Sequence, residues 1–108
     1  IMSGGHFNYK QHSLEYDIIE KLEEAIQNLQ DTEHYHYVHL PLVREKFFEA
    51  LVLIRSAKVY LDNIDYLLCG DTGEDTFIER LNTDLNKLKD ELDQFEKEHI
   101  KHEKSNNV

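Results

Sequence analysis

Seven histidines in 108 residues are the first side chains whose chemistry stands out. His34, His36 and His39 lie close together, and an H-x-H pair places two imidazoles on one side of an extended strand, as a zinc or nickel site can use. No Asp, Glu or Cys at ligand spacing completes a set. We therefore keep these three histidines only as weak metal candidates and expect no cofactor. The preferred interpretation is a polar connector that packs Tyr35 and Tyr37 on the end of a helical bundle.

A second group of candidate residues lies in the N-terminal leader. Paired glycines beside two aromatic residues and a histidine allow a tight backbone turn while Phe7 and Tyr9 dock on a surface. His6 would then sit in a pocket beside the turn at Asp71 or the neighbouring helix. The alternative is a flexible leader in which Phe7 acts as a hydrophobic latch. The predicted ligand or partner contacts are His6, Phe7 and Tyr9 together with Asp71 and Glu74.

No catalytic motif accompanies these residues. The sequence has no G-x-S-x-G or H-E-x-x-H motif, no phosphate-binding glycine loop and no EF-hand. The single cysteine, Cys69, excludes an intramolecular disulfide and is expected to be a buried thiol in a reducing cytoplasm. We therefore expect a protein that is not an enzyme, with a metal-dependent enzyme as the least favoured alternative.

The charge balance narrows the class of partner. With 22 acidic and 12 basic residues the formal charge is -10, which disfavours direct binding to nucleic acid or to an anionic membrane surface. No apolar run approaches the roughly 20 residues that span a bilayer, and the N-terminus lacks a signal-peptide layout. The sequence predicts a cytoplasmic acidic protein.

Periodicity predicts a first helix over residues 13–30, with Ser13 as its N-cap. Its apolar residues recur every three or four positions, as one helix face requires: Leu14, Ile18, Ile19, Leu22, Ala25, Ile26 and Leu29. The other face has one base, Lys21, and five acids: Glu15, Asp17, Glu20, Glu23 and Glu24. This is a solvated face or, through Glu20, Glu23 and Glu24, a binding surface for a basic partner.

The second helix is predicted over residues 41–69. Pro41 suits its first turn, and Gly70 stands where a left-handed terminator is expected. Its apolar residues cover almost the whole circumference, and its four acids and four bases balance. Such a helix cannot stand at the surface. We expect it to be flanked by the two acidic helices or by another subunit.

The third helix, over residues 74–103, has the most regular pattern. Thr72 with Asp75, and Thr76 with Glu79, resemble capping pairs at its start. A heptad seam follows: Ile78, Leu81, Leu85, Leu88, Leu92, Phe95, His99 and His102. At about 1.5 Å per residue this helix outreaches the first one. Its C-terminal half should therefore pair with another copy or fray, and we expect a homo-oligomer.

Two segments resemble a family of small phage, prophage and bacterial proteins that has no established activity. They are the Met-Ser-Gly-Gly-His-Phe leader at residues 2–7 and the acidic turn within residues 65–77. The resemblance implies a phage-linked intracellular role. It also gives weight to a set of positions beyond packing: Gly4, Gly5, His6, Phe7, Gly70, Asp71, Gly73 and Glu74.

Together these patterns predict an all-α fold. We expect a three-helix antiparallel bundle or helical hairpin with a long C-terminal heptad helix, formed by a single domain over residues 13–103 between a leader, 1–12, and a disordered tail, 104–108. The expected function is non-enzymatic: a phage-type acidic protein that binds a basic surface on a host protein and blocks it in the host cytoplasm. The alternative is an oligomeric protein that sequesters a nucleotide-like small molecule.

Overall fold

The computed structural model describes Phe7 and residues 9–29 and 40–100, and every regular element within them is a helix. The first helix runs without a break through α1 (Gln11–Ser13), the π-helical segment η1 (Leu14–Ile19) and α2 (Glu20–Asn28). The other two are α3 (Leu40–Leu68) and α4 (Glu74–His99). The expected all-α fold with three packed helices is confirmed.

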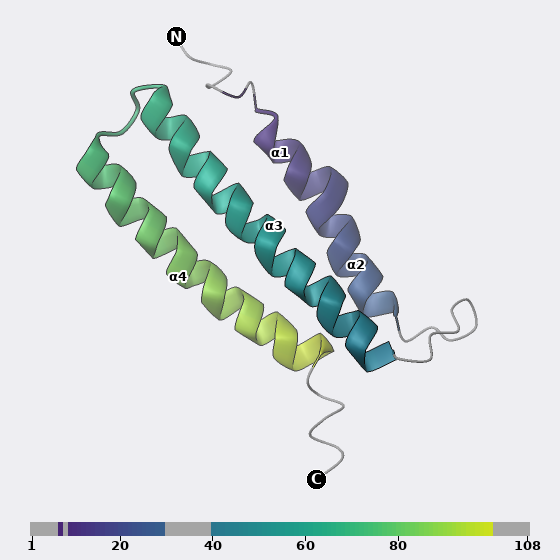
Figure 1. The fold of residues 1–108 in the computed structure, drawn as a ribbon. Coiled ribbons are helices and arrows are strands. Elements are labelled where there is room, and N and C mark those ends of the chain that lie inside the picture. The colour runs from purple at the N-terminus through teal and green to yellow at the C-terminus, as the bar shows by residue number, and fades with distance from the viewer. Residues whose placement is uncertain (1–6, 8, 30–39, 101–108) are drawn as a thin grey trace.

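The three helices lie side by side, antiparallel, with α3 in the middle (Figure 1). One side of α3 packs against α1, η1 and α2, and another side packs against α4. The molecule measures 52 × 28 × 15 Å, so the bundle is flattened into a layer about one helix thick. The prediction that the most apolar helix is central and flanked by the two acidic helices is confirmed.

The core forms where the outer helices meet α3. Leu51 of α3 is completely buried and belongs to one cluster with residues of all three helices. The other buried members are Ile19, Ile26, Leu88, Leu92 and Ile100. Near the start of α3 and the end of α4, Phe48 stacks on Phe95 with ring centroids 6.3 Å apart. The heptad seam of α4 is therefore used within the chain.

This packing changes the argument for self-association through α4. α4 is longer than the first helix, but it is not longer than α3. The 29 residues of α3 extend about 43 Å and match the 26 residues of α4. α4 needs no second copy to cover Leu88 and Leu92. It also ends at His99 rather than at residue 103, and residues 101–103, with His102, lie outside the described residues.

The first helix differs from its prediction in two ways. It begins at Gln11, and the Ser13 hydroxyl donates a hydrogen bond to the Lys10 carbonyl at 2.7 Å rather than capping an N-terminus. The wider π-helical turns of η1 also shift the phase of the face that meets α3. Ile19 is completely buried, but Ile18, expected in the same apolar stripe, is 46% exposed.

The turn between α3 and α4 follows from two glycines. Gly70 has φ +80°, its amide donates to Leu67 O at 3.1 Å, and the Asp71 amide donates to Tyr66 O at 2.9 Å, which makes a Schellman motif. Gly73 is the N-cap of α4 and offers no side-chain cap. The predicted capping pairs at Thr72 and Thr76 are therefore wrong, because α4 starts directly at Glu74.

Within the described parts of the chain, no helix is both long enough and apolar enough to cross a membrane.

Replacing Gly70 by Ala tests the terminator. A Cβ at this position meets no atom within 4 Å, so the cost is the left-handed backbone itself, about 1–2 kcal/mol of unfolding free energy in urea denaturation. Gly73→Ala is the matched control: its φ is −89°, and a Cβ there is also free of contacts. We expect that control to change stability by less than about 0.5 kcal/mol. Equal losses in both variants would contradict the role given to Gly70.

Candidate functional site

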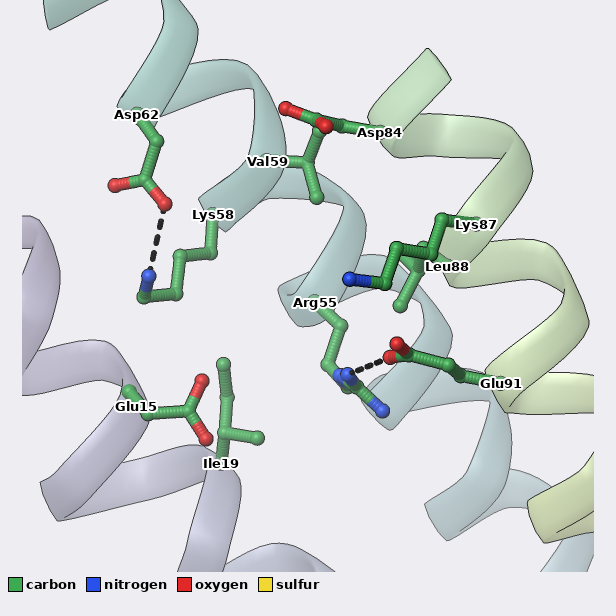
Figure 2. A pocket seen from close by; sticks show the side chains of 10 residues that line it. All are labelled: Glu15, Ile19, Arg55, Lys58, Val59, Asp62, Asp84, Lys87, Leu88 and Glu91. Carbon is green, nitrogen blue, oxygen red and sulfur yellow. Dashed lines mark hydrogen bonds and ion pairs between the residues drawn. The ribbon is translucent and has the colours of Figure 1, made fainter. Parts of the chain in front are cut away.

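A polar groove of about 250 Å³ lies where the first helix, α3 and α4 come together (Figure 2). Its floor is apolar, and its walls carry three cations and four carboxylates. The lining residues are Glu15, Ile19, Arg55, Lys58, Val59, Asp62, Asp84, Lys87, Leu88 and Glu91. The groove is the place where charges from all three helices converge.

Arg55 occupies the centre of the groove and links both outer helices to α3. Its Nη2 donates to Glu91 Oε1 of α4 at 2.8 Å, and its Nη1 donates to Glu23 Oε2 of α2 at 3.5 Å. The Arg55 side chain is 22% exposed, against 27% for Glu23 and 45% for Glu91. Arg55 thus makes one close, partly wet ion pair and one longer, drier one.

Most of the other charges in the groove have partners on the protein. Lys58 Nζ lies 2.8 Å from Asp62 Oδ2, one turn further along α3. The amide of Asn63, itself 2% exposed, donates to Asp84 Oδ2 of α4 at 3.1 Å and to the Val59 carbonyl at 2.9 Å. Lys87 extends from α4 over the groove toward α3 (Figure 2). The groove is therefore mainly a set of inter-helix ties.

Burial shapes the electrostatics of Glu23. Loss of solvent raises the pKa of the Glu23 carboxyl above 4.5, the attraction of Arg55 opposes that rise, and the neighbouring carboxylates of Glu15, Glu20 and Glu91 add to it. Ionised Glu23 therefore carries a net cost in the folded protein, even with Arg55 beside it.

The chemistry of the groove is limited. Among the described residues no group of three or more His, Cys, Asp or Glu is placed to hold a metal ion. The lining contains no serine, cysteine or histidine that could act as a nucleophile or base, and its carboxylates outnumber its cations, which disfavours a polyphosphate ligand.

The predicted acidic face of the first helix divides in two. Glu20 and Glu24 are exposed on the outer side, together with Asp17. Glu23, predicted to be one of its members, faces inward to Arg55. Tyr16, which the sequence pattern did not single out, is 64% exposed beside these carboxylates.

The leader is anchored at the far end of α3. The Phe7 amide donates to Asp65 Oδ1 at 3.1 Å, and Gln11 Nε2 donates to Asp65 Oδ2 at 3.3 Å. Cys69 is half-buried, with its thiol 3.7 Å from Asp65 Oδ1. Asp65 is only 6% exposed, so the acid that receives the leader is a buried residue of α3.

The remaining predicted site residues do not converge on one pocket in the described part of the chain. Asp71 and Glu74 are exposed at the α3–α4 turn. Tyr9 is 54% exposed with a left-handed φ of 62°, and its ring lies 5.7 Å from that of His12. His6 and the connector histidines His34, His36 and His39 lie outside the described residues.

Sequence reasoning missed Arg55 and Asp65 as charged residues of α3 that tie other segments to it. A signal was present for Arg55, because it and Lys58 are the two bases in the apolar middle of a helix expected between two acidic ones. Asp65 carried no such signal, since its partners Phe7 and Gln11 come from a segment more than 50 residues away.

We expect Arg55→Met to lower the free energy of unfolding by about 1–2 kcal/mol, because it leaves half-buried Glu23 unpaired while keeping the packing of the aliphatic stem. Lys46→Met is the matched control. It removes the Lys46–Glu49 pair, whose side chains are 65% and 62% exposed, and should change stability by less than about 0.5 kcal/mol. Equal losses of stability for the two variants in urea denaturation would contradict the claim that the ion pairs of Arg55 between helices stabilise the fold.

The raised pKa of Glu23 gives a pH dependence of known sign. A carboxyl whose pKa is higher in the folded state binds its proton more tightly there, so its contribution favours folding at low pH and is lost as pH rises through the folded pKa. The stability of the wild type minus that of Glu23→Gln should therefore fall as pH rises above 4.5, the ordinary pKa of a glutamate carboxyl. Paired urea titrations at several pH values measure this difference, and a rising difference would refute the assignment.

Comparison with known proteins found no matching family model, no matching curated protein and no matching solved structure. The resemblance to phage and prophage proteins therefore stays a prediction, and the functional argument rests on the residues themselves.

Proposed function

We propose that this chain is a non-enzymatic binding protein that docks on a basic surface of a host protein and blocks it. The observation that carries the proposal is the outer side of the first helix. There Asp17, Glu20 and Glu24 are exposed with a single base, Lys21, and Tyr16 is 64% exposed among them. We name Tyr16, Asp17, Glu20 and Glu24 the acidic stripe.

The composition of the acidic stripe suits a protein partner. Glu20 lies four positions after Tyr16 and three after Asp17, and Glu24 lies four after Glu20, so the stripe follows one side of the helix that a partner can meet along its length. Carboxylates attract a basic surface and raise the rate of encounter, and the overall charge of -10 strengthens this attraction. An exposed tyrosine supplies the kind of aromatic anchor that often dominates binding energy.

The setting we propose is the reducing cytoplasm of a bacterial host. It is supported by the single free thiol and by the resemblance of the leader and the acidic turn to phage-type proteins. A basic surface made for nucleic acid is one natural target, because a carboxylate stripe can occupy the place of phosphates.

Self-association stays part of the proposal, on a changed basis. The α4 seam that first suggested it packs on α3 within the chain. The part of the seam around Leu88, Leu92 and Phe95 is therefore not open to a second copy.

Sequestering of a nucleotide-like ligand gains no support from the described residues. Phe7 meets the buried carboxylate of Asp65, and the exposed Asp71 lies at the same end of α3. Two carboxylates at that end would repel a phosphate group.

The test compares two triple variants of equal charge. Immobilised wild-type protein first captures a partner from host lysate at low salt, and calorimetry then measures its Kd. Neutralising Asp17, Glu20 and Glu24 to their amides should weaken Kd at least about tenfold, the equivalent of about 1.4 kcal/mol. The control neutralises Glu79, Asp90 and Asp93, which are exposed on α4, and should stay within about twofold.

Two results would refute this function. One is a lysate that yields no specific partner at any salt concentration. The other is an equal loss of affinity in the stripe variant and the α4 variant, which would show attraction by net charge alone. Tyr16→Ala adds a charge-independent check, since removal of the aromatic anchor should weaken the same complex.

A further inference from the structure

One side of α3 carries large apolar side chains that no other described helix covers. Ala50, Leu53, Ala57, Tyr60 and Ile64 are spaced by three and four residues and so share one helix face. Leu53 is 72% exposed and Tyr60 is 44% exposed, and both alanines are exposed. We name these five residues the α3 crest.

The crest is exposed because the three helices lie in one flat layer, so that no described helix packs on the broad side of α3. Figure 1 shows α3 with one neighbour on each side, and the molecule is 15 Å thick against a width of 28 Å. Leu51, only two residues before Leu53, points into the core and is completely buried. The apolar character of α3 therefore exceeds what two flanking helices can cover.

A groove runs alongside the crest between α3 and α4. Its two hollows measure about 210 and 530 Å³. Both contain Phe48 and Val52 of α3, and α4 contributes Leu85 and Leu92 to one of them. Four carboxylates, Glu45, Glu49, Asp93 and Glu96, also line these hollows. A second acidic chain is therefore not drawn into the groove, and the crest beside it is the uncharged surface.

Charge favours a copy of this chain over a basic partner at the crest. The five crest residues are uncharged, although the whole chain has a charge of -10, because Arg55, Lys58 and Asp62 of the same stretch line the polar groove instead. Two such chains repel wherever their acids meet, so an uncharged face is where they can approach. At the end of the crest Lys46 already neutralises Glu49 at 3.4 Å.

The sizes of the crest residues are also self-complementary. When two copies of the crest are laid antiparallel about a two-fold axis, Leu53 faces the partner's Ala57 and Tyr60 faces the partner's Ala50. Leu53 and Tyr60 then each meet an alanine on both sides of the axis, as an isologous interface requires, and Ile64 lies opposite the aliphatic stem of the partner's Lys46. A parallel arrangement in register would instead oppose Leu53 with Leu53 and Tyr60 with Tyr60.

We propose that a second copy of the chain packs antiparallel on the α3 crest and forms a two-fold symmetric dimer. This rests on the self-association named in the proposed function and assigns its surface. The broad side of the layer measures 52 × 28 Å, which accommodates the roughly 800 Å² that each partner buries in a stable dimer.

Light scattering coupled to size exclusion over a range of concentrations tests the proposal. The wild type should have twice the monomer mass of 12.9 kDa. Leu53→Lys should raise the dimer dissociation constant at least about 30-fold, as expected for an anchor at the centre of an interface. Ile78→Lys and Tyr16→Lys are matched controls, because these residues are 54% and 64% exposed on other helices. Both should remain dimers.

The register is tested by cysteine pairing in a Cys69→Ser background. A mixture of the Leu53→Cys and Ala57→Cys proteins should form a mixed disulfide faster than either protein alone forms its own. Circular dichroism of each variant checks that the helices persist, since Leu53 is too exposed for its loss to unfold the chain.

Three outcomes would overturn the dimer. They are a wild type that stays monomeric at every concentration, a dimer that survives Leu53→Lys, and a dimer broken equally by Ile78→Lys. A monomer would mean that something other than a second copy covers the crest. The acidic stripe variant separates the two proposals, because it should remain a dimer while losing the host partner, whereas Leu53→Lys should keep one-to-one affinity for that partner.

Discussion

The structure depends on one constraint, which is that α3 is apolar around almost its whole circumference. A helix of this kind must be covered, and the described part of the chain supplies two helices to do so. The first helix and α4 each give their apolar face to α3, so most of their acids are left on the outside. Apolar residues are concentrated in α3 and acids in the two flanking helices. This distribution accounts both for the central position of α3 and for the acidic exterior of a chain with a charge of -10.

Apolar burial and ion pairing have different roles in this arrangement. Full burial of a residue such as Leu51 contributes about 1.5–3 kcal/mol, whereas each partly exposed ion pair contributes about 1 kcal/mol or less. Packing against α3 therefore drives assembly. Arg55 adds alignment, because its guanidinium reaches Glu23 on one side and Glu91 on the other only when both outer helices have the correct register.

The sequence was sufficient for features that neighbouring residues determine. Gly70 ends α3 because its backbone is left-handed, and Glu74 begins α4 just after the second glycine, both as predicted. It was insufficient wherever the answer depends on another helix. Ile18 is exposed because the π-helical turns of η1 change the phase of the helix, and no local propensity predicts that change.

The candidate site shows the same limit. In the sequence Glu23 looks like a surface acid. It faces inward because its partner, Arg55, lies 32 residues away on α3. Leu53 looks like a core residue, yet no described helix reaches its side of α3. Periodicity identifies which residues share a face, but which face is covered depends on how many helices surround it.

The two surfaces that remain open have different chemistry and lie on different helices. The acidic stripe is an exposed side of the first helix, and the crest is on α3 itself. Pairing two copies through the crest would bury mainly uncharged surface and leave both stripes exposed. Such a dimer would present two anionic surfaces in a fixed geometry. A partner with two matching basic surfaces would then be held with a gain of about 10²–10⁴ over a single contact, without any additional contact between the chains.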